Sequence, residues 1–303
     1  MAKSKEMNVL KSIAKRVIPR EHRLQLRIVG ERWKNRWIHF GFAQRWIHFG
    51  FARFCPCCKA RLRRFTPCGL AERYALGQRQ EAICPVCQSK ERHRLVWLYM
   101  TEKANLFDGN QKKMLHVAPE PELSELIQKA DYINYLSADL TAPNAMVKMD
   151  ITDIQYPDST FDVIYCSHVL EHVYDDRKAM REFYRVLKPG GWAILQVPIT
   201  ADTTFEDPTA SSPKERERLF GQFDHVRRYG PDYKDRLMGV GFSVTVDGFV
   251  RELDDRAVRR FGLMRDEDVY FCRKQDDMKA FESSSDLPPR QSSTVSSDAA
   301  IKT

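Results

Sequence analysis

Strand-like and helix-like segments alternate from Met114 to Lys274, and this alternation limits the folds open to the chain more than any other feature. Met114–Val117 is a short apolar run, a helical pattern begins at about Glu122, and further apolar runs follow at Val163–Cys166 and Gly191–Val197. Two strands joined through a helix run parallel in one sheet, with the helix packed on a face of that sheet. We therefore predict an α/β fold, doubly wound, with a mainly parallel sheet and helices on both faces.

Six of the eight cysteines precede these segments, between residues 55 and 87. Two Cys-Pro-x-Cys turns each place a pair of thiolates where both can bind one ion. A closed site of four thiolates is typical of structural zinc, which keeps no open position for catalysis. The four cysteines that match this geometry are Cys55, Cys58, Cys84 and Cys87. Cys57 and Cys68 remain, and either is an alternative ligand.

The basic residues gather at the front of the chain. Residues 1–100 hold 22 Lys and Arg against 6 Glu, whereas residues 101–303 hold 27 basic and 35 acidic residues. An excess of positive charge attracts phosphates. We therefore expect polyanion contact, with RNA or anionic lipid, through the basic N-terminus; an ordinary solvated surface is the alternative.

No apolar run is long enough to span a membrane, because Arg and His break the most aromatic stretch, Trp37–Phe54. The N-terminus lacks the apolar core of a secretory signal, since Lys11, Lys15 and Arg16 interrupt it. We expect a cytoplasmic protein. The basic amphipathic pattern of residues 7–18 adds the alternative of a peripheral position at the membrane surface.

Two acidic residues end predicted strands and indicate a nucleoside site. Asp139 ends the strand that follows the first apolar run, 23 residues after His116. An acid at about this offset accepts both ribose hydroxyls of a nucleoside at the carboxyl edge of such a sheet. Asp150 ends the next strand and can accept the adenine amino group, with Ile151 packed on the ring. For each acid alone, a strand-end cap is the alternative.

Five short motifs between Lys113 and Ile199 occur in a definite order: Tyr135–Asp139, Met149–Ile151, Phe161–Ile164, His168–His172 and Val186–Gly191. In this order they resemble the core of class I S-adenosylmethionine-dependent methyltransferases. The cysteine turns, the Glu91–Arg94 segment and the Asp224–Arg227 segment resemble bacterial members that carry an N-terminal four-cysteine, zinc-ribbon-like module. The resemblance covers roughly residues 54–275.

The resemblance implies a seven-stranded, Rossmann-like methyltransferase sheet and S-adenosyl-L-methionine as the cofactor. The residues implied to contact this cofactor are His116, Ala118, Glu120, Asp139, Asp150, Ile151, Ser167 and His168. One departure stands out, because the family's glycine-rich first motif is replaced by residues 116–122, which contain no glycine. Glycine lets the backbone approach a ligand closely, so this loop must hold the methionine end differently. We expect Glu120 to receive the ammonium group.

These patterns divide the chain into four parts. Residues 1–53 form a basic N-terminal segment that repeats one octapeptide at 36–43 and 45–52. Residues 54–89 form the zinc-ribbon-like module and residues 90–275 the methyltransferase domain. Residues 276–303 are rich in Ser and Asp, with few large apolar groups, and form a tail that we expect to be disordered.

The segment after the fifth predicted strand is expected to act as a lid over the acceptor. It contains His225, which can take a proton from an acceptor hydroxyl. His172 is the second candidate for this catalytic role, with packing as its alternative. We predict methyl transfer to a small-molecule or glycosyl acceptor, in cell-surface saccharide biosynthesis. The alternatives are an RNA methyltransferase that binds RNA through the zinc module, and a non-catalytic zinc-ribbon adaptor with a degenerate cofactor fold.

Overall fold

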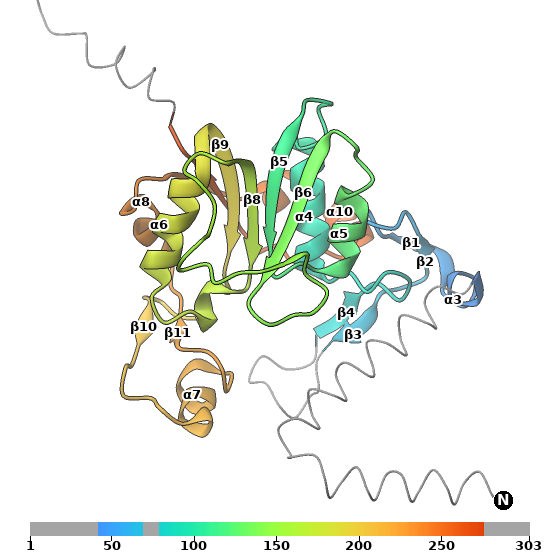
Figure 1. Ribbon diagram of the computed structural model, residues 1–303. Coiled ribbons are helices and arrows are strands. Elements are labelled where there is room, and N and C mark those ends of the chain that lie inside the picture. Colours follow the sequence, from blue (N-terminus) through green and yellow to red (C-terminus); the bar gives the residue numbers. More distant parts are fainter. Residues whose placement is uncertain (1–41, 69–78, 276–303) are drawn as a thin grey trace, which may run out of the picture.

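A seven-stranded sheet forms the centre of the computed structural model, which describes residues 42–68 and 79–275 (Figure 1). In chain order its strands are β5 (Lys112–Val117), β6 (Ile133–Asp139), β7 (Val147–Lys148), β8 (Phe161–Ser167), β9 (Leu187–Gln196), β12 (Ser243–Asp247) and β13 (Val269–Arg273). Their order across the sheet is β12-β13-β9-β8-β5-β6-β7. The chain therefore starts in the middle and winds outward in both directions, so that the winding reverses between β5 and β8. Ligands of such sheets bind beside this reversal, at the carboxyl ends of the strands.

The strands β7, β6, β5, β8 and β9 run parallel to one another, whereas β13 is antiparallel to both β9 and β12. Successive side chains of a strand point to opposite faces. Met114 accordingly joins the hydrophobic core on one face of the sheet, and Leu115 joins the core on the other. Both are fully buried, which explains why two apolar residues stand next to each other in β5. The predicted doubly wound, mainly parallel sheet is confirmed.

Two groups of helices cover the two faces. One face carries α4 (Glu91–Glu102), α5 (Pro121–Ile127), α9 (Phe249–Glu252) and α10 (Asp255–Phe261), whose apolar side chains share a core with Met114. The other face carries α6 (Asp176–Val186) and α8 (Tyr233–Met238), which pack on Leu115 and its neighbours. Figure 1 shows α4 and α5 on the opposite side of the sheet from α6 and α8. Among the described residues, no helix is long and apolar enough to cross a membrane.

The cysteine-rich module consists of short strands beside the large sheet. After α3 (Phe42–Ile47) come β1 (Phe49–Phe54), β2 (Arg61–Leu62), β3 (Thr66–Cys68) and β4 (Arg79–Ile83). β1 pairs with β2, and β3 pairs with β4. The second octapeptide copy lies in α3 and β1, so the first strand of this small sheet begins ahead of residue 54, the boundary expected from the sequence. Most of the N-terminal segment and the whole tail at 276–303 lie outside the described residues.

The segment between β9 and α8 folds into a separate lobe at the carboxyl edge of the sheet. It contains the paired strands β10 (Phe205–Glu206) and β11 (Arg227–Arg228) and the helix α7 (Pro213–Phe220). Ser212 and Glu215 form a capping box at the start of α7, and Gly221 ends it with φ of 84°. This left-handed conformation favours glycine. In Figure 1 the lobe and the β3–β4 pair lie on either side of the same edge.

Candidate active site

Three neighbouring strands end at one level and form the floor of the candidate site. Val117 of β5 lies opposite Ala138 of β6 and Cys166 of β8. The residues that follow, Ala118, Asp139 and Ser167, therefore share one edge. Ala118 adopts φ of 50°, in the left-handed region that favours glycine. The chain thus makes the sharp turn of a glycine loop without a glycine.

Asp139 and Asp150 both cap turns with one carboxylate oxygen. Asp139 Oδ1 accepts hydrogen bonds from the backbone N–H groups of Thr141 and Ala142, each at 2.7 Å. Asp150 lies two residues beyond the end of β7, and its Oδ1 accepts from the N–H of Thr152 at 2.8 Å. Met149 N–H donates to the backbone oxygen of Asp139 at 3.0 Å, which brings the two loops together. Each acid keeps its second oxygen for another partner, and the neighbouring Ile151 is buried.

Glu120 follows the turn and is held by buried polar side chains. Its Oε2 lies 2.8 Å from His116 Nε2, and its Oε1 lies 3.4 Å from the Tyr165 hydroxyl. Burial by itself raises the pKa of Glu120, but the hydrogen bond from His116 and the charges of His93, His116 and Arg92 outweigh it and lower the pKa to about 2. Glu120 is therefore ionised at neutral pH. His116 is fully buried, and its other ring nitrogen lies 2.8 Å from the Tyr135 hydroxyl. The imidazole is therefore fixed at both nitrogens and holds the Glu120 carboxylate in place.

The first turn of α4 also reaches this loop, although the sequence indicated nothing about this turn beyond a family resemblance. His93 Nδ1 lies 2.7 Å from Glu122 Oε1, and His93 Nε2 lies 3.7 Å from Glu120 Oε1. Arg94 is fully buried and donates to the carbonyl oxygens of Ala82, Ser89, Phe261 and Gly262. It therefore fastens α4 both to the cysteine-rich module and to the large domain. The sequence signal for this contact was the family resemblance of the Glu91–Arg94 segment, which follows the second cysteine turn directly.

A second cluster forms where the lobe meets the short helix η1 (Leu170–His172) after β8. The rings of His172 and His225 lie edge to face with centroids 4.7 Å apart. A ring nitrogen of each and a carboxylate oxygen of Glu171 lie within 4.8 Å of one another. The backbone N–H of Val226 donates to Glu171 O at 2.9 Å and fixes the lobe there. The structure thus brings together the two residues that we predicted as proton acceptors, although they lie 53 positions apart in the chain.

The surroundings favour the neutral form of two of these imidazoles. The pKa of His225 is lowered from the usual 6.5, first by burial and then by the neighbouring His172. The pKa of His168 is also lowered by burial, against the opposing effect of Glu171, whose Oε1 lies 3.4 Å from His168 Nδ1. A neutral imidazole can accept a proton. His225 is therefore in the state that a general base needs at neutral pH.

Arg227 stabilises the position of the lobe. It is buried and donates to Glu206 at 2.7 Å and to the carbonyl oxygens of Leu170 and Tyr174 at 2.8 and 2.7 Å. Arg236 binds the same Glu206 at 2.7 Å. These bonds tie β10 and β11 to the segment after η1. Arg227 thus holds the lobe against the edge of the sheet, and its guanidinium is already occupied.

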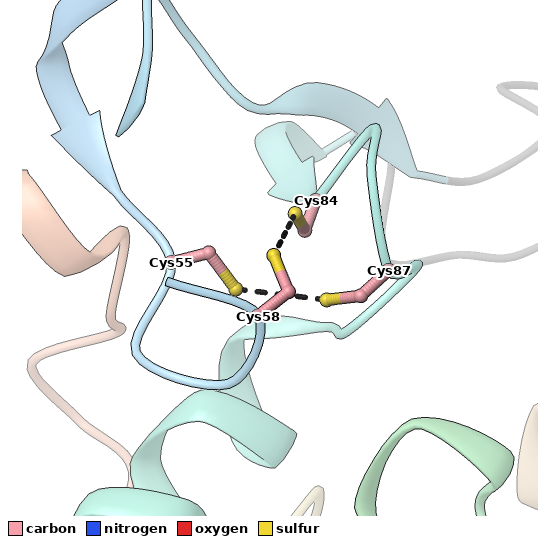
Figure 2. Close-up of side chains that lie close together, drawn as sticks. All are labelled: Cys55, Cys58, Cys84 and Cys87. Carbon is pink, nitrogen blue, oxygen red and sulfur yellow. Dashed lines mark hydrogen bonds between the residues drawn. The ribbon is translucent and has the colours of Figure 1, made fainter. Parts of the chain in front are cut away.

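The four predicted cysteine ligands meet in the module, although 26 positions separate the two turns (Figure 2). Their sulfur atoms all lie within 4.8 Å of one another. Cys55 and Cys87 are 3.6 Å apart, and Cys58 and Cys84 are 3.7 Å apart. A tetrahedral zinc with bonds of about 2.3 Å separates its sulfur ligands by about 3.8 Å. The donor set therefore fits one zinc ion, whereas the sulfur of Cys57 lies near the backbone of His93 instead.

Comparison with known proteins identifies the large domain. Residues 112–195 match the family described as methyltransferase domain, and this range runs from the start of β5 to the end of β9. It contains the carboxyl edge and all the expected cofactor residues. The chain therefore carries a methyltransferase domain of the S-adenosylmethionine-dependent class, as the motif order implied.

Short stretches also match curated methyltransferases. The chain is 46% identical over 46 residues to phosphoethanolamine N-methyltransferase 3 of Arabidopsis thaliana, which is 15% of this chain and 9% of that protein. It is 49% identical over 49 residues to the ubiquinone/menaquinone biosynthesis C-methyltransferase UbiE of Enterobacter sp. (strain 638), which is 16% and 20% of the two chains. The match thus spans a fifth or less of these relatives. A solved S-adenosylmethionine-dependent methyltransferase from Archaeoglobus fulgidus is similar over 59% of this chain and 93% of its own, with 17% identity and a TM-score of 0.40.

Proposed function

We propose that this protein transfers a methyl group from S-adenosylmethionine to a small-molecule or glycosyl acceptor. The observation that supports this most is the arrangement at one sheet edge: Asp139 and Glu120 on the floor, and the His172–His225 pair where the lobe crosses. A lobe fixed over the edge encloses the acceptor, which suits a small molecule better than a long polymer. When bound, the cofactor supplies a methyl group already activated on a sulfonium, so the protein mainly has to align the acceptor.

Each residue at this edge of the sheet binds a different part of the cofactor. Asp139 accepts the ribose hydroxyls with its free oxygen, and Asp150 accepts the adenine amino group, with Ile151 packed on the ring. Ionised Glu120 receives the ammonium group. Ala118, Ser167 and His168 line the pocket between them, and His116 acts through Glu120. These assignments are supported by the shared level of the strand ends and by the ionisation of Glu120.

His225 is our choice for the proton acceptor, with His172 beside it. A hydroxyl acceptor must lose its proton as its oxygen bonds to the methyl group, and a neutral imidazole can take that proton. The lowered pKa of His225 supports this role. The decisive experiment is a screen for transfer of labelled methyl groups to sugar and RNA pools. Label in a saccharide fraction supports the proposal, and label confined to RNA would overturn the acceptor class.

We further propose that the four cysteines hold a structural zinc ion. All four positions are sulfur, so the ion has no open site and takes no part in methyl transfer. The sulfur separations support this assignment. Because thiolate sites of this kind persist in reducing compartments, we place the protein in the cytoplasm.

A basic cavity supports polyanion contact as a second candidate function. A cavity of about 440 Å³ lies between β1 and α10, and its lining includes Arg256, Arg259 and Arg260. None of these three arginines forms an ion pair with an acid in the part of the chain that the structure describes. The adjacent Phe51 side chain is 72% exposed. Arginines beside an exposed aromatic ring suit a phosphate chain with stacking bases, so RNA is the polyanion that this surface favours.

A further inference from the structure

Arg92 lies in the first turn of α4, and its side chain has a buried nitrogen without a partner. Arg92 Nε is shielded from solvent, and its N–H donates no hydrogen bond to any group within residues 42–68 and 79–275. The adjacent His93 contacts Glu120 and Glu122, so this turn lies against the β5–α5 loop. Burial is the largest influence on both neighbours: it raises the pKa of Glu120 and lowers that of His168. The positive charge of Arg92 lowers the pKa of each of them. A partly buried guanidinium beside a ligand site calls for an anion.

The loop itself offers few donors for an anionic group. The N–H of Ala118 already donates to Ala138 O at 2.8 Å. Pro119 and Pro121 have no N–H, and the carboxylate of Glu120 repels a second carboxylate. A loop with so few backbone donors is poorly suited to hold the carboxylate of an amino acid through its backbone. A nearby cationic side chain is needed for that group.

We propose that Arg92 binds the carboxylate of the amino-acid part of the cofactor, while Glu120 receives its ammonium group. The inference rests on the proposed function and adds a binding residue outside residues 112–195. A guanidinium suits a carboxylate because it donates two parallel hydrogen bonds. The carboxylate and ammonium groups of the cofactor are then bound by opposite charges on two elements, α4 and the β5–α5 loop. The helix that follows the cysteine-rich module completes the cofactor pocket in this arrangement.

Calorimetry with two ligands tests the assignment on the full-length protein. S-adenosylmethionine carries the carboxylate, whereas decarboxylated S-adenosylmethionine keeps the ammonium and sulfonium groups and lacks it. We expect the wild type to prefer the first ligand by about 10- to 100-fold, the value of charge-assisted hydrogen bonds. Arg92→Ala should lose this preference by weakening only the carboxylate-bearing ligand. Arg181→Ala, which removes an exposed arginine on α6, should change neither affinity.

The outcomes separate this inference from the function on which it rests. Equal weakening of both ligands by Arg92→Ala, or no weakening of either, overturns the role of Arg92 and leaves the methyltransferase proposal standing. A wild type that binds neither ligand overturns both. Arg92→Lys keeps the charge but loses the two-pronged geometry, so it should retain part of the preference. This variant decides the question if Arg92→Ala fails to fold, and an unchanged melting temperature confirms that it is folded.

Discussion

At the scale of single residues, charge placement compensates for the missing glycines of the first motif. Ala118 makes the left-handed turn that glycine makes more cheaply, and Glu120 fills the loop with a carboxylate. A non-glycine residue in this conformation costs roughly 1 kcal/mol, which the surrounding hydrogen bonds must offset. The backbone turn is preserved, and in our proposal side chains replace backbone groups in binding the methionine end of the cofactor.

Replacing Asp139 tests the ribose contact. Asp139→Ala should weaken the binding of S-adenosylhomocysteine by about 10- to 100-fold for each ribose hydrogen bond lost, because a hydrogen bond to a charged group contributes about 1.5–3 kcal/mol. Asp139 also caps its own turn, so Asp139→Asn is the matched control: it keeps an oxygen for Thr141 and Ala142 and removes the charge. Calorimetry should show that Asp139→Asn binds the ligand with an affinity between those of the wild type and Asp139→Ala. A lower melting temperature with unchanged affinity in Asp139→Ala would leave Asp139 only as a turn cap.

The pH dependence of turnover tests His225. Its pKa is lowered below 6.5, so the imidazole is neutral at and above neutral pH. Turnover should therefore be constant above about pH 7 and fall as the pH drops below 6.5 and the ring becomes protonated. His225→Ala should reduce kcat by about 10²–10⁴-fold, with cofactor affinity intact, and added imidazole should restore part of it. Full activity in this variant, with a loss in His172→Gln, would assign the proton to His172.

At the scale of elements, α4 links the two parts of the molecule. Its first turn follows the second cysteine turn, and Arg94 ties it to Ala82 and Ser89 on one side and to Phe261 and Gly262 on the other. The side chains of this turn also reach the cofactor loop. The start of this one helix therefore contacts both the small module and the β5–α5 loop.

Metal analysis of cysteine variants tests the module. The purified wild type should hold one zinc ion per chain, and Cys84→Ser should lose it, because three thiolates bind zinc more weakly than four. Cys68→Ser is the control, since Cys68 belongs to the same module but lies outside the cluster. Loss of zinc should also lower the melting temperature. Wild-type protein without metal, or full zinc content in Cys84→Ser, would contradict the assignment.

At the scale of the whole molecule, the two proposed functions lie on two different surfaces. The carboxyl edge of the sheet, between the lobe and the module, holds the proposed chemistry (Figure 1). The arginine-lined cavity between β1 and α10 belongs instead to the contact of the module with the large domain. Its arginines Arg256, Arg259 and Arg260 therefore lie outside the basic N-terminal segment for which the sequence predicted polyanion contact.

Neutralising this cavity tests the polyanion contact. The triple change of Arg256, Arg259 and Arg260 to Gln should weaken binding to single-stranded RNA and reduce the slope of log affinity against log salt by about 2–3, roughly 0.7–0.9 per lost phosphate contact. Cofactor affinity should stay the same. The matched control replaces three exposed cations elsewhere, Lys129, Lys178 and Arg181, and should have little effect. Binding to anionic vesicles but not to RNA would contradict a nucleic-acid surface. So would an unchanged slope of log RNA affinity against log salt in the triple variant.

Local patterns in the chain were enough to predict the parallel sheet, the four-cysteine set and the place of Asp139 at a strand end, because periodicity and short spacings are local properties. The sequence also placed Glu120 at the turn. It did not show that β13 inserts between β9 and β12, or that His225 packs on His172. Nor did it assign Arg92 and His93 to the cofactor loop. Those contacts join residues far apart in the chain, and only the packing of helices and the lobe on the finished sheet decides which of them meet.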